Sequence, residues 1–267
     1  MDLSGIKMIV SDMDGTLLNS NHEVSDRFFK LYRELKKKGI LFVAASGRQY
    51  NSMASKLAPI KDDIIIIAEN GAYAKKQDEV LLTTPIGAAN IDVVLSHISN
   101  VEGAHPVLCT KDNAYVDGNS DKFLKVLGEY YSEFEIIQDR TLATGEVLKI
   151  AIYHFENSEQ YVYPAVQQLE DQLKVKVSGS NWVDVSHTNA HKGYALQQVM
   201  ETYKIGNNEL VVFGDYNNDL EMLALSDYSF AMANAHPNVL KAANYTTTSN
   251  NDFGVESILE KILESKA

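Results

Sequence analysis

Short apolar runs alternate with amphipathic stretches through the first seventy residues. Three runs, 6–10, 40–45 and 64–68, are dominated by aliphatic residues, which is typical of buried strands. Between the first two, residues 26–38 place apolar side chains at helical spacing between a serine that can cap a helix and a glycine that can end it. A second helix is predicted near residues 51–57. Strands and helices that alternate in this way predict a parallel sheet with right-handed crossovers.

The pattern changes at about residue 84, after a predicted hairpin over residues 73–81. From there to residue 187 predicted strands follow one another directly, with helices interspersed, which is typical of an α+β module. We predict helices at 89–99, 121–131 and 158–173, and strands at 106–110, 114–117, 134–138, 147–155, 175–178 and 182–186. This stretch therefore predicts a separate module inserted into the first one.

The α/β alternation returns from Lys192, where a helix is predicted to begin, and a strand follows at 209–213. The remaining predicted elements are strands at 228–233 and 245–248, a helix around 239–243 between them and a last helix from residue 254. The predicted fold class is therefore α/β. A doubly wound, mostly parallel sheet is formed by residues 1–83 and 188–267, and an α+β domain is inserted at 84–187.

Composition and charge narrow the range of partners. The 267-residue chain is 45% hydrophobic and has a formal net charge of -12, which disfavours nucleic acid and anionic membranes because both require a basic face. The single cysteine, Cys109, excludes an internal disulfide and a Cys-based metal site. No signal-peptide pattern is evident at the start, and the longest aliphatic run, 64–68, is too short to cross a bilayer. We therefore expect a cytoplasmic protein.

Reactive side chains gather where the predicted strands end. Asp12 and Asp14 follow the first strand, Ser46 follows the second, and Asp215 and Asp219 follow a later one. Two carboxylates at the end of a buried strand repel each other and cost desolvation. Such a pair usually persists because a cation lies between them or because one of them does chemistry. Since ligands bind outside the carboxyl ends of parallel strands, all five side chains are predicted to share one edge of the sheet.

This set of side chains suits phosphoryl transfer. Asp12, Asp14 and Asp215 offer the oxygen ligands that Mg²⁺ prefers, and Asp14 can contribute either its side chain or its backbone carbonyl. A carboxylate can attack phosphorus to give an aspartyl-phosphate, which divides one difficult step into two. Lys192 can place a positive charge beside the transferring oxygens, and Ser46 can donate a hydrogen bond.

The motif at residues 12–16 (Asp-Met-Asp-Gly-Thr), with Ser46, Lys192 and the segment 214–219, resembles the four motifs of the haloacid dehalogenase (HAD) superfamily. The module at 84–187 resembles the C2B cap of the Cof-type, subfamily IIB sugar-phosphate phosphatases. The resemblance covers essentially the whole chain. It implies a HAD-type Rossmann-like core, a Mg²⁺ cofactor, and hydrolysis of small phosphorylated metabolites, sugar phosphates above all, through an aspartyl-phosphate.

The resemblance also implies a role for each matching residue. Asp12 would be the nucleophile and a metal ligand. Asp14 would be the general acid and then the general base, and would bind the metal through its carbonyl. Asp215 would bind the metal, and Asp219 would either bind it directly or support its ligands. The implied phosphate-binding residues are Ser46, Gly47, Lys192 and Asn218, and the possible substrate contacts are Arg48, Asn70 and Gly71. For Arg48, a structural ion pair is an equally good interpretation.

Asp14 is the position that discriminates among the chemistries of this superfamily, because dehalogenases lack it and P-type ATPases carry threonine there. Its presence favours phosphatases and phosphomutases. The alternatives are a phosphohexomutase of the same superfamily and a non-catalytic regulator that binds sugar phosphates. The sequence weighs against the regulator, because no residue of the four motifs is missing. Tyr216 departs from the smaller residue that many relatives carry.

Overall fold

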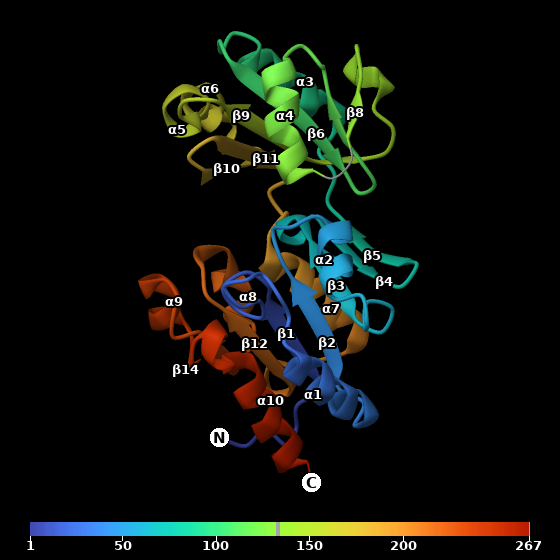
Figure 1. Ribbon diagram of the computed structural model, residues 1–267, viewed down its shortest axis with the longest axis vertical. Helices are drawn as coiled ribbons and strands as arrows, with labels where there is room; N and C mark the ends of the chain where they lie inside the picture. Colours follow the sequence, from blue (N-terminus) through green and yellow to red (C-terminus); the bar gives the residue numbers. More distant parts are fainter. Residues whose placement is uncertain (132–133, 267) are drawn as a thin grey trace. The chain divides into compact units, whose positions relative to one another are not determined.

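The computed structural model describes residues 1–131 and 134–266 (Figure 1). The chain divides into two compact units, of which the first consists of Met1–Leu82 with His191–Ala267 and the second of Thr83–Ala190. Both ends of the chain therefore build one unit, and the middle third builds the other. In the described residues we find no helix with the combined length and apolar character needed to cross a membrane.

Within the described residues, the first unit is built on an eight-stranded sheet with the strand order β14-β13-β12-β1-β2-β3-β4-β5. The parallel strands are β1 (Met8–Asp12), β2 (Leu41–Ala45), β3 (Ile65–Ala68), β12 (Leu210–Gly214), β13 (Tyr228–Ala231) and β14 (Tyr245–Thr246). The hairpin of β4 (Tyr73–Lys76) and β5 (Glu79–Thr83) extends one edge, with β4 antiparallel to β3. The chain winds outward from β1 and later returns at β12 on its other side. The predicted doubly wound, mostly parallel sheet is confirmed.

Helix α1 (Asp26–Lys37) begins where the sequence predicts and packs against α10 (Gly254–Ser265) (Figure 1). The Ser25 hydroxyl accepts a hydrogen bond from the Phe28 N–H at 3.0 Å, which caps the helix. The same hydroxyl donates to Glu256 Oε1 at 2.5 Å, and Glu256 is buried. The other helices of this unit are α2 (Tyr50–Lys56), α7 (Lys192–Tyr203), α8 (Leu220–Leu223) and α9 (Pro237–Ala242).

The second unit contains, in its described part, a six-stranded sheet with the order β10-β11-β9-β6-β7-β8. Its strands are β6 (Ala104–Thr110), β7 (Ala114–Val116), β8 (Glu135–Ile136), β9 (Val147–His154), β10 (Lys174–Gly179) and β11 (Trp182–Ser186). Helices α3 (Ala88–Ile98) and α6 (Tyr163–Val166) contribute to one hydrophobic cluster, and α4 (Asp121–Tyr130) to another. The two clusters take up alternate residues of β6 and β9, so they lie on opposite faces of the sheet.

The prediction of one continuous helix over residues 158–173 is wrong. The structure divides it into α5 (Ser158–Tyr161), α6 and a 3₁₀ turn at Gln167–Leu169. Pro164 lies in the first turn of α6. Proline lacks an N–H and disfavours helical geometry in the residue before it, so it can begin a helix but cannot easily continue one. The apolar periodicity of this stretch did not reveal the break.

The first strand lies two residues further along the chain than the predicted run 6–10. Backbone pairing continues beyond the last apolar residue, Val10, and Asp12 pairs in register with Ala45 of β2. Asp12 is therefore part of the rigid sheet, and Asp14 lies in the turn that follows. The strands predicted at 134–138, 228–233 and 245–248 are also shorter, as β8, β13 and β14.

We predict that Ser25→Ala destabilises the protein by about 1–3 kcal/mol, because it removes a helix cap and leaves a buried Glu256 oxygen without its donor. Urea unfolding followed by circular dichroism measures the change. Ser4→Ala is the control, because Ser4 is exposed and its hydroxyl makes no hydrogen bond among the described residues. Equal unfolding midpoints for the two variants would contradict this account of the α1–α10 contact.

Candidate active site

Parallel strands bring the residues predicted for the site to one edge of the first unit's sheet. Asp12 is the last residue of β1, Ser46 follows β2 directly, and Asp215 follows β12 directly. Because β12, β1 and β2 are neighbours, their carboxyl ends are adjacent. Lys192, the first residue of α7, reaches the same edge from a helix.

The Lys192 ammonium lies between two carboxylates. Its Nζ donates to Asp12 Oδ1 at 2.5 Å and to Asp219 Oδ1 at 2.7 Å, and the side chains of Lys192 and Asp219 are fully buried. Burial alone would lower the pKa of Lys192, but the charges of Asp12 and Asp219 raise it above its ordinary value. Lys192 is therefore a permanent positive charge within the site.

Negative charge exceeds positive charge around this ammonium. Asp12, Asp215 and Asp219 can each bring one oxygen within 4.8 Å of the others. Burial raises the pKa of Asp12 well above its ordinary value although Lys192 opposes this, and burial together with the charge of Asp219 raises the pKa of Asp215 to about 6. Asp12 Oδ2 is buried and makes no hydrogen bond with the described residues. A divalent cation bound by Asp12 and Asp215 would relieve both the repulsion and the unpaired oxygen.

Asp219 has little capacity left for such a cation. Its Oδ1 accepts from Lys192, and its Oδ2 accepts from the backbone N–H groups of Asp215 and Tyr216 at 3.0 and 3.1 Å. These bonds fix the loop after β12 and so hold the Asp215 carboxylate in place. Asp219 thus ties Lys192 to the loop that carries Asp215.

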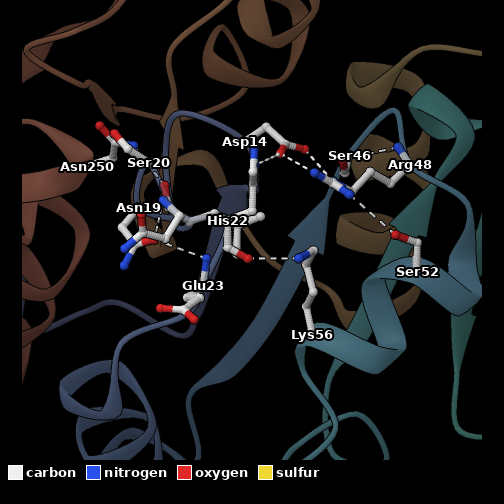
Figure 2. Close-up of polar contacts among 12 residues, drawn as sticks. Asp14, Asn19, Ser20, His22, Glu23, Ser46, Arg48, Ser52, Lys56 and Asn250 are labelled. Carbon is white, nitrogen blue, oxygen red and sulfur yellow. Dashed lines mark hydrogen bonds and ion pairs between the residues drawn. The ribbon is translucent and has the colours of Figure 1, made fainter. Parts of the chain in front are cut away.

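The Asp14 side chain points toward Arg48 and bonds to it (Figure 2). Arg48 Nε and one terminal nitrogen donate to the two Asp14 oxygens, both at 2.6 Å, and His22 Nδ1 lies 3.4 Å from Oδ1. Burial acts to raise the pKa of Asp14, but the hydrogen bonds and charge of Arg48 lower it below its ordinary value. Arg48 and Asp14 thus form an ion pair, and the Asp14 carboxylate is not one of the group formed by Asp12, Asp215 and Asp219.

A second network joins the remaining predicted residues. The buried Ser46 hydroxyl accepts from the Arg48 N–H at 3.2 Å, and the Ser46 carbonyl accepts from the Asn70 N–H at 2.9 Å. The Asn218 amide donates to Asn70 Oδ1 at 3.0 Å. Gly47 packs against the Asn70 amide, where a Cβ would lie 3.0 Å from Nδ2. Asn70 therefore links the loop after β2 to the loop after β12.

Two glycines allow the backbone to approach closely within the site. Gly15 has a φ of +80°, and a Cβ there would collide with the Asp215 carboxylate. Gly71 has a φ of +99°, and a Cβ there would collide with the carbonyl of His191, the residue before Lys192. The absence of a side chain at Gly71 thus allows the start of α7 to pack closely against it.

Sequence reasoning missed two groups at this edge. His22 faces Asp14 from a turn of left-handed backbone geometry, and its carbonyl accepts from Lys56 at 2.8 Å (Figure 2). Asn234 donates to the Gly15 carbonyl at 2.8 Å and so helps to fix the loop after β1. No local sequence pattern predicts these contacts. Asn234 is far from Gly15 in the sequence, and His22 is separated from Asp14 by a turn.

A family model for haloacid dehalogenase-like hydrolases matches residues 9–259. The chain belongs to this family. Over 265 residues this HAD-like hydrolase is 31% identical to the 5-amino-6-(5-phospho-D-ribitylamino)uracil phosphatase YbjI of Escherichia coli (strain K12), with 98% of each chain covered. The predicted superfamily and the predicted class of enzyme, a phosphatase, are confirmed.

Solved structures of similar proteins agree with this assignment. SMU.1108c from Streptococcus mutans UA159 is 29% identical and superposes with a TM-score of 0.84, covering 97% of this chain and 99% of the other. The subclass IIB sugar phosphatase BT4131 is 20% identical with a TM-score of 0.79, covering 96% of this chain and 98% of the other, which shows the same fold.

We predict that Gly71→Ala in this hydrolase costs about 1–3 kcal/mol of stability, because alanine is strained at the positive φ and its methyl group would displace the start of α7. Thermal and chemical unfolding measure the loss. Gly87→Ala is the matched control, since Gly87 has an ordinary φ and open space around its Cα. If both variants unfold like the wild type, the close approach of Gly71 to α7 does not contribute to the free energy of unfolding.

Proposed function

We propose that this HAD-type phosphatase requires Mg²⁺ and hydrolyses small phosphorylated metabolites, sugar phosphates in particular, through an aspartyl-phosphate on Asp12. The observation that carries the proposal is the Asp12 carboxylate itself. Lys192 holds one of its oxygens, and the other is buried with no hydrogen bond among the described residues. A buried oxygen without a donor costs free energy, and a functional site is where such a cost is usually retained.

Asp12 and Asp215 would hold the cation, with the backbone carbonyl of Asp14 as a further proposed ligand. The support is the unpaired Asp12 oxygen and the surplus of carboxylates, both of which suit a hard divalent ion. When bound, Mg²⁺ would offset the negative charge that an arriving phosphate brings to three aspartates. Asp219 would keep Lys192 and the Asp215 loop in position.

The reaction would proceed in two displacements at phosphorus. In the first, an Asp12 oxygen forms a bond to phosphorus, the ester P–O bond breaks, and Asp14 gives a proton to the departing oxygen. In the second, water attacks the phosphorus, the Asp12–phosphorus bond breaks, and Asp14 takes the proton of the water. Lys192, Ser46 and Asn218 would hold the phosphoryl oxygens, joined by the backbone of the Ser46 loop at Gly47.

The contact between Asp14 and Arg48 bears on the order of these steps. With its pKa lowered by Arg48, Asp14 is an ionised carboxylate here, which is the form that accepts a proton from water. To give a proton to the leaving group, Asp14 must first leave Arg48 and become protonated. Substrate binding would release Asp14, because the guanidinium of Arg48 can bind a phosphate ester in place of the carboxylate.

The substrate class rests on the relatives. The name of YbjI describes a phosphate ester of a ribityl chain carried by a uracil derivative. By analogy, we propose that this enzyme takes a phosphorylated sugar or sugar alcohol. We also propose that residues 84–187 are the cap module of the enzyme and that residues 1–83 with 188–267 are its catalytic core.

Asp12→Asn should reduce phosphate release from a panel of hexose, pentose and sugar-alcohol phosphates by more than about 10³-fold, because the amide cannot form the acyl phosphate. Circular dichroism checks that the variant is folded, and Asp78→Asn, at an exposed carboxylate on the β4–β5 turn, is the matched control. Substantial turnover by Asp12→Asn would exclude Asp12 as nucleophile. If the wild-type enzyme converts a hexose phosphate into an isomer without releasing phosphate, it is a mutase instead.

Removal of Mg²⁺ should abolish turnover, and its return should restore it. Independently of activity, Mg²⁺ should raise the unfolding temperature of the wild type, because it relieves repulsion among the aspartates, and Asp215→Asn should lose most of that rise. Differential scanning fluorimetry with and without EDTA measures this. Full activity in EDTA, or an equal Mg²⁺-induced rise for Asp215→Asn, would contradict the metal assignment.

A further inference from the structure

A cavity of about 400 Å³ opens within the second unit, on the face of its sheet that carries α3. Its floor is apolar: Leu95 and Ile98 of α3 face Leu108 of β6 and Tyr115 of β7. All residues that line it lie between positions 95 and 140, so none of them belongs to the unit that holds Asp12 and Lys192. Its volume lies in the range of about 300–1,000 Å³ that is usual for small-molecule sites.

The cavity has a geometric cause. A six-stranded sheet spans about 24 Å between its outer strands, because neighbouring strands lie about 4.8 Å apart. Two helices, each about 10 Å wide, cannot cover that width. Segments α5 and α6 pack against β9, β10 and β11, and α3 packs beside α6, so a gap remains between the end of α3 and the strands β6 and β7. The segment that follows β8 borders this gap and leaves it partly open.

The rim of the cavity carries hydrogen-bonding groups of mixed character. Arg140 forms an ion pair with Asp92 of α3, which leaves further N–H donors of the guanidinium unused among the described contacts. Asp117 accepts from the Asn119 N–H through one oxygen, so its second oxygen can accept another bond. The Gln138 amide makes no hydrogen bond within the described residues and offers both a donor and an acceptor.

These features select the kind of ligand. Two carboxylates against one guanidinium leave the rim slightly negative, on a chain whose net charge is -12, so an anion is disfavoured. The apolar floor favours an aromatic or aliphatic body, and the rim favours an edge with both a donor and an acceptor. We propose that this cavity is a binding site for a neutral fused heterocycle whose ring amide pairs with Gln138 and whose rings lie on Leu95, Leu108 and Tyr115.

The compound 2-quinolone is a suitable probe, because it joins an apolar ring to a neutral ring amide. Titrated against the full chain and followed by saturation-transfer NMR, it should bind saturably. Two matched compounds test the edge. The first, 2-methoxyquinoline, keeps the rings but lacks the N–H and should bind about 5-fold more weakly, the effect of one hydrogen bond. The second, 2-quinolone-4-carboxylate, adds a negative charge and should also bind more weakly than 2-quinolone.

Three variants locate the site. Leu95→Trp should weaken 2-quinolone binding at least about 10-fold by filling the cavity, and Gln138→Ala about 5-fold by removing the amide partner. Gln138 is exposed, so its variant should fold normally, and Gln172→Ala, an exposed glutamine of the same unit outside the lining, should bind like the wild type. Absence of saturable binding, or binding that neither Leu95→Trp nor Gln138→Ala weakens, would overturn the proposal.

Discussion

A fully buried ammonium is the constraint on which the rest of the site depends. Lys192 can be buried only because Asp12 and Asp219 both bond to it, since an unpaired buried charge costs several kcal/mol and loss of one partner from such a group costs about 3–5 kcal/mol. The three residues come from the end of β1, the start of α7 and the loop after β12. Their mutual requirement therefore fixes these three segments to one another at the edge where the reaction is proposed.

Backbone geometry makes this arrangement possible. The start of α7 can reach the sheet edge because Gly71 leaves no side chain in its path, and the Asp215 carboxylate can approach the loop after β1 because Gly15 leaves none there. Asn70, itself in the left-handed region, joins the loops after β2 and β12. Strained or unusual backbone that gathers in this way at a sheet edge is typical of a site whose geometry matters more than its stability.

The electrostatics divide the aspartates into two kinds. Asp12 and Asp219 share the Lys192 ammonium, and together with Asp215 they retain an excess of negative charge, which favours a cation. Asp14, only two residues from Asp12, belongs instead to Arg48, and its pKa is lowered rather than raised. The lowered pKa keeps Asp14 in the ionised form that can accept a proton, whereas the raised pKa values of Asp12 and Asp215 reflect carboxylates that are buried beside one another.

The sequence by itself determined the architecture and most of the site. Apolar runs and helical periodicity are local signals, and they placed the parallel strands and hence the common edge of Asp12, Ser46 and Asp215. Local signals cannot choose partners among side chains that are far apart in the chain. The pairing of Asp14 with Arg48, the bond between Asn70 and Asn218 and the cavity beside α3 were therefore decided only by the tertiary structure. Each of these depends on which surfaces remain uncovered, and which charges remain unpaired, once the whole chain has packed.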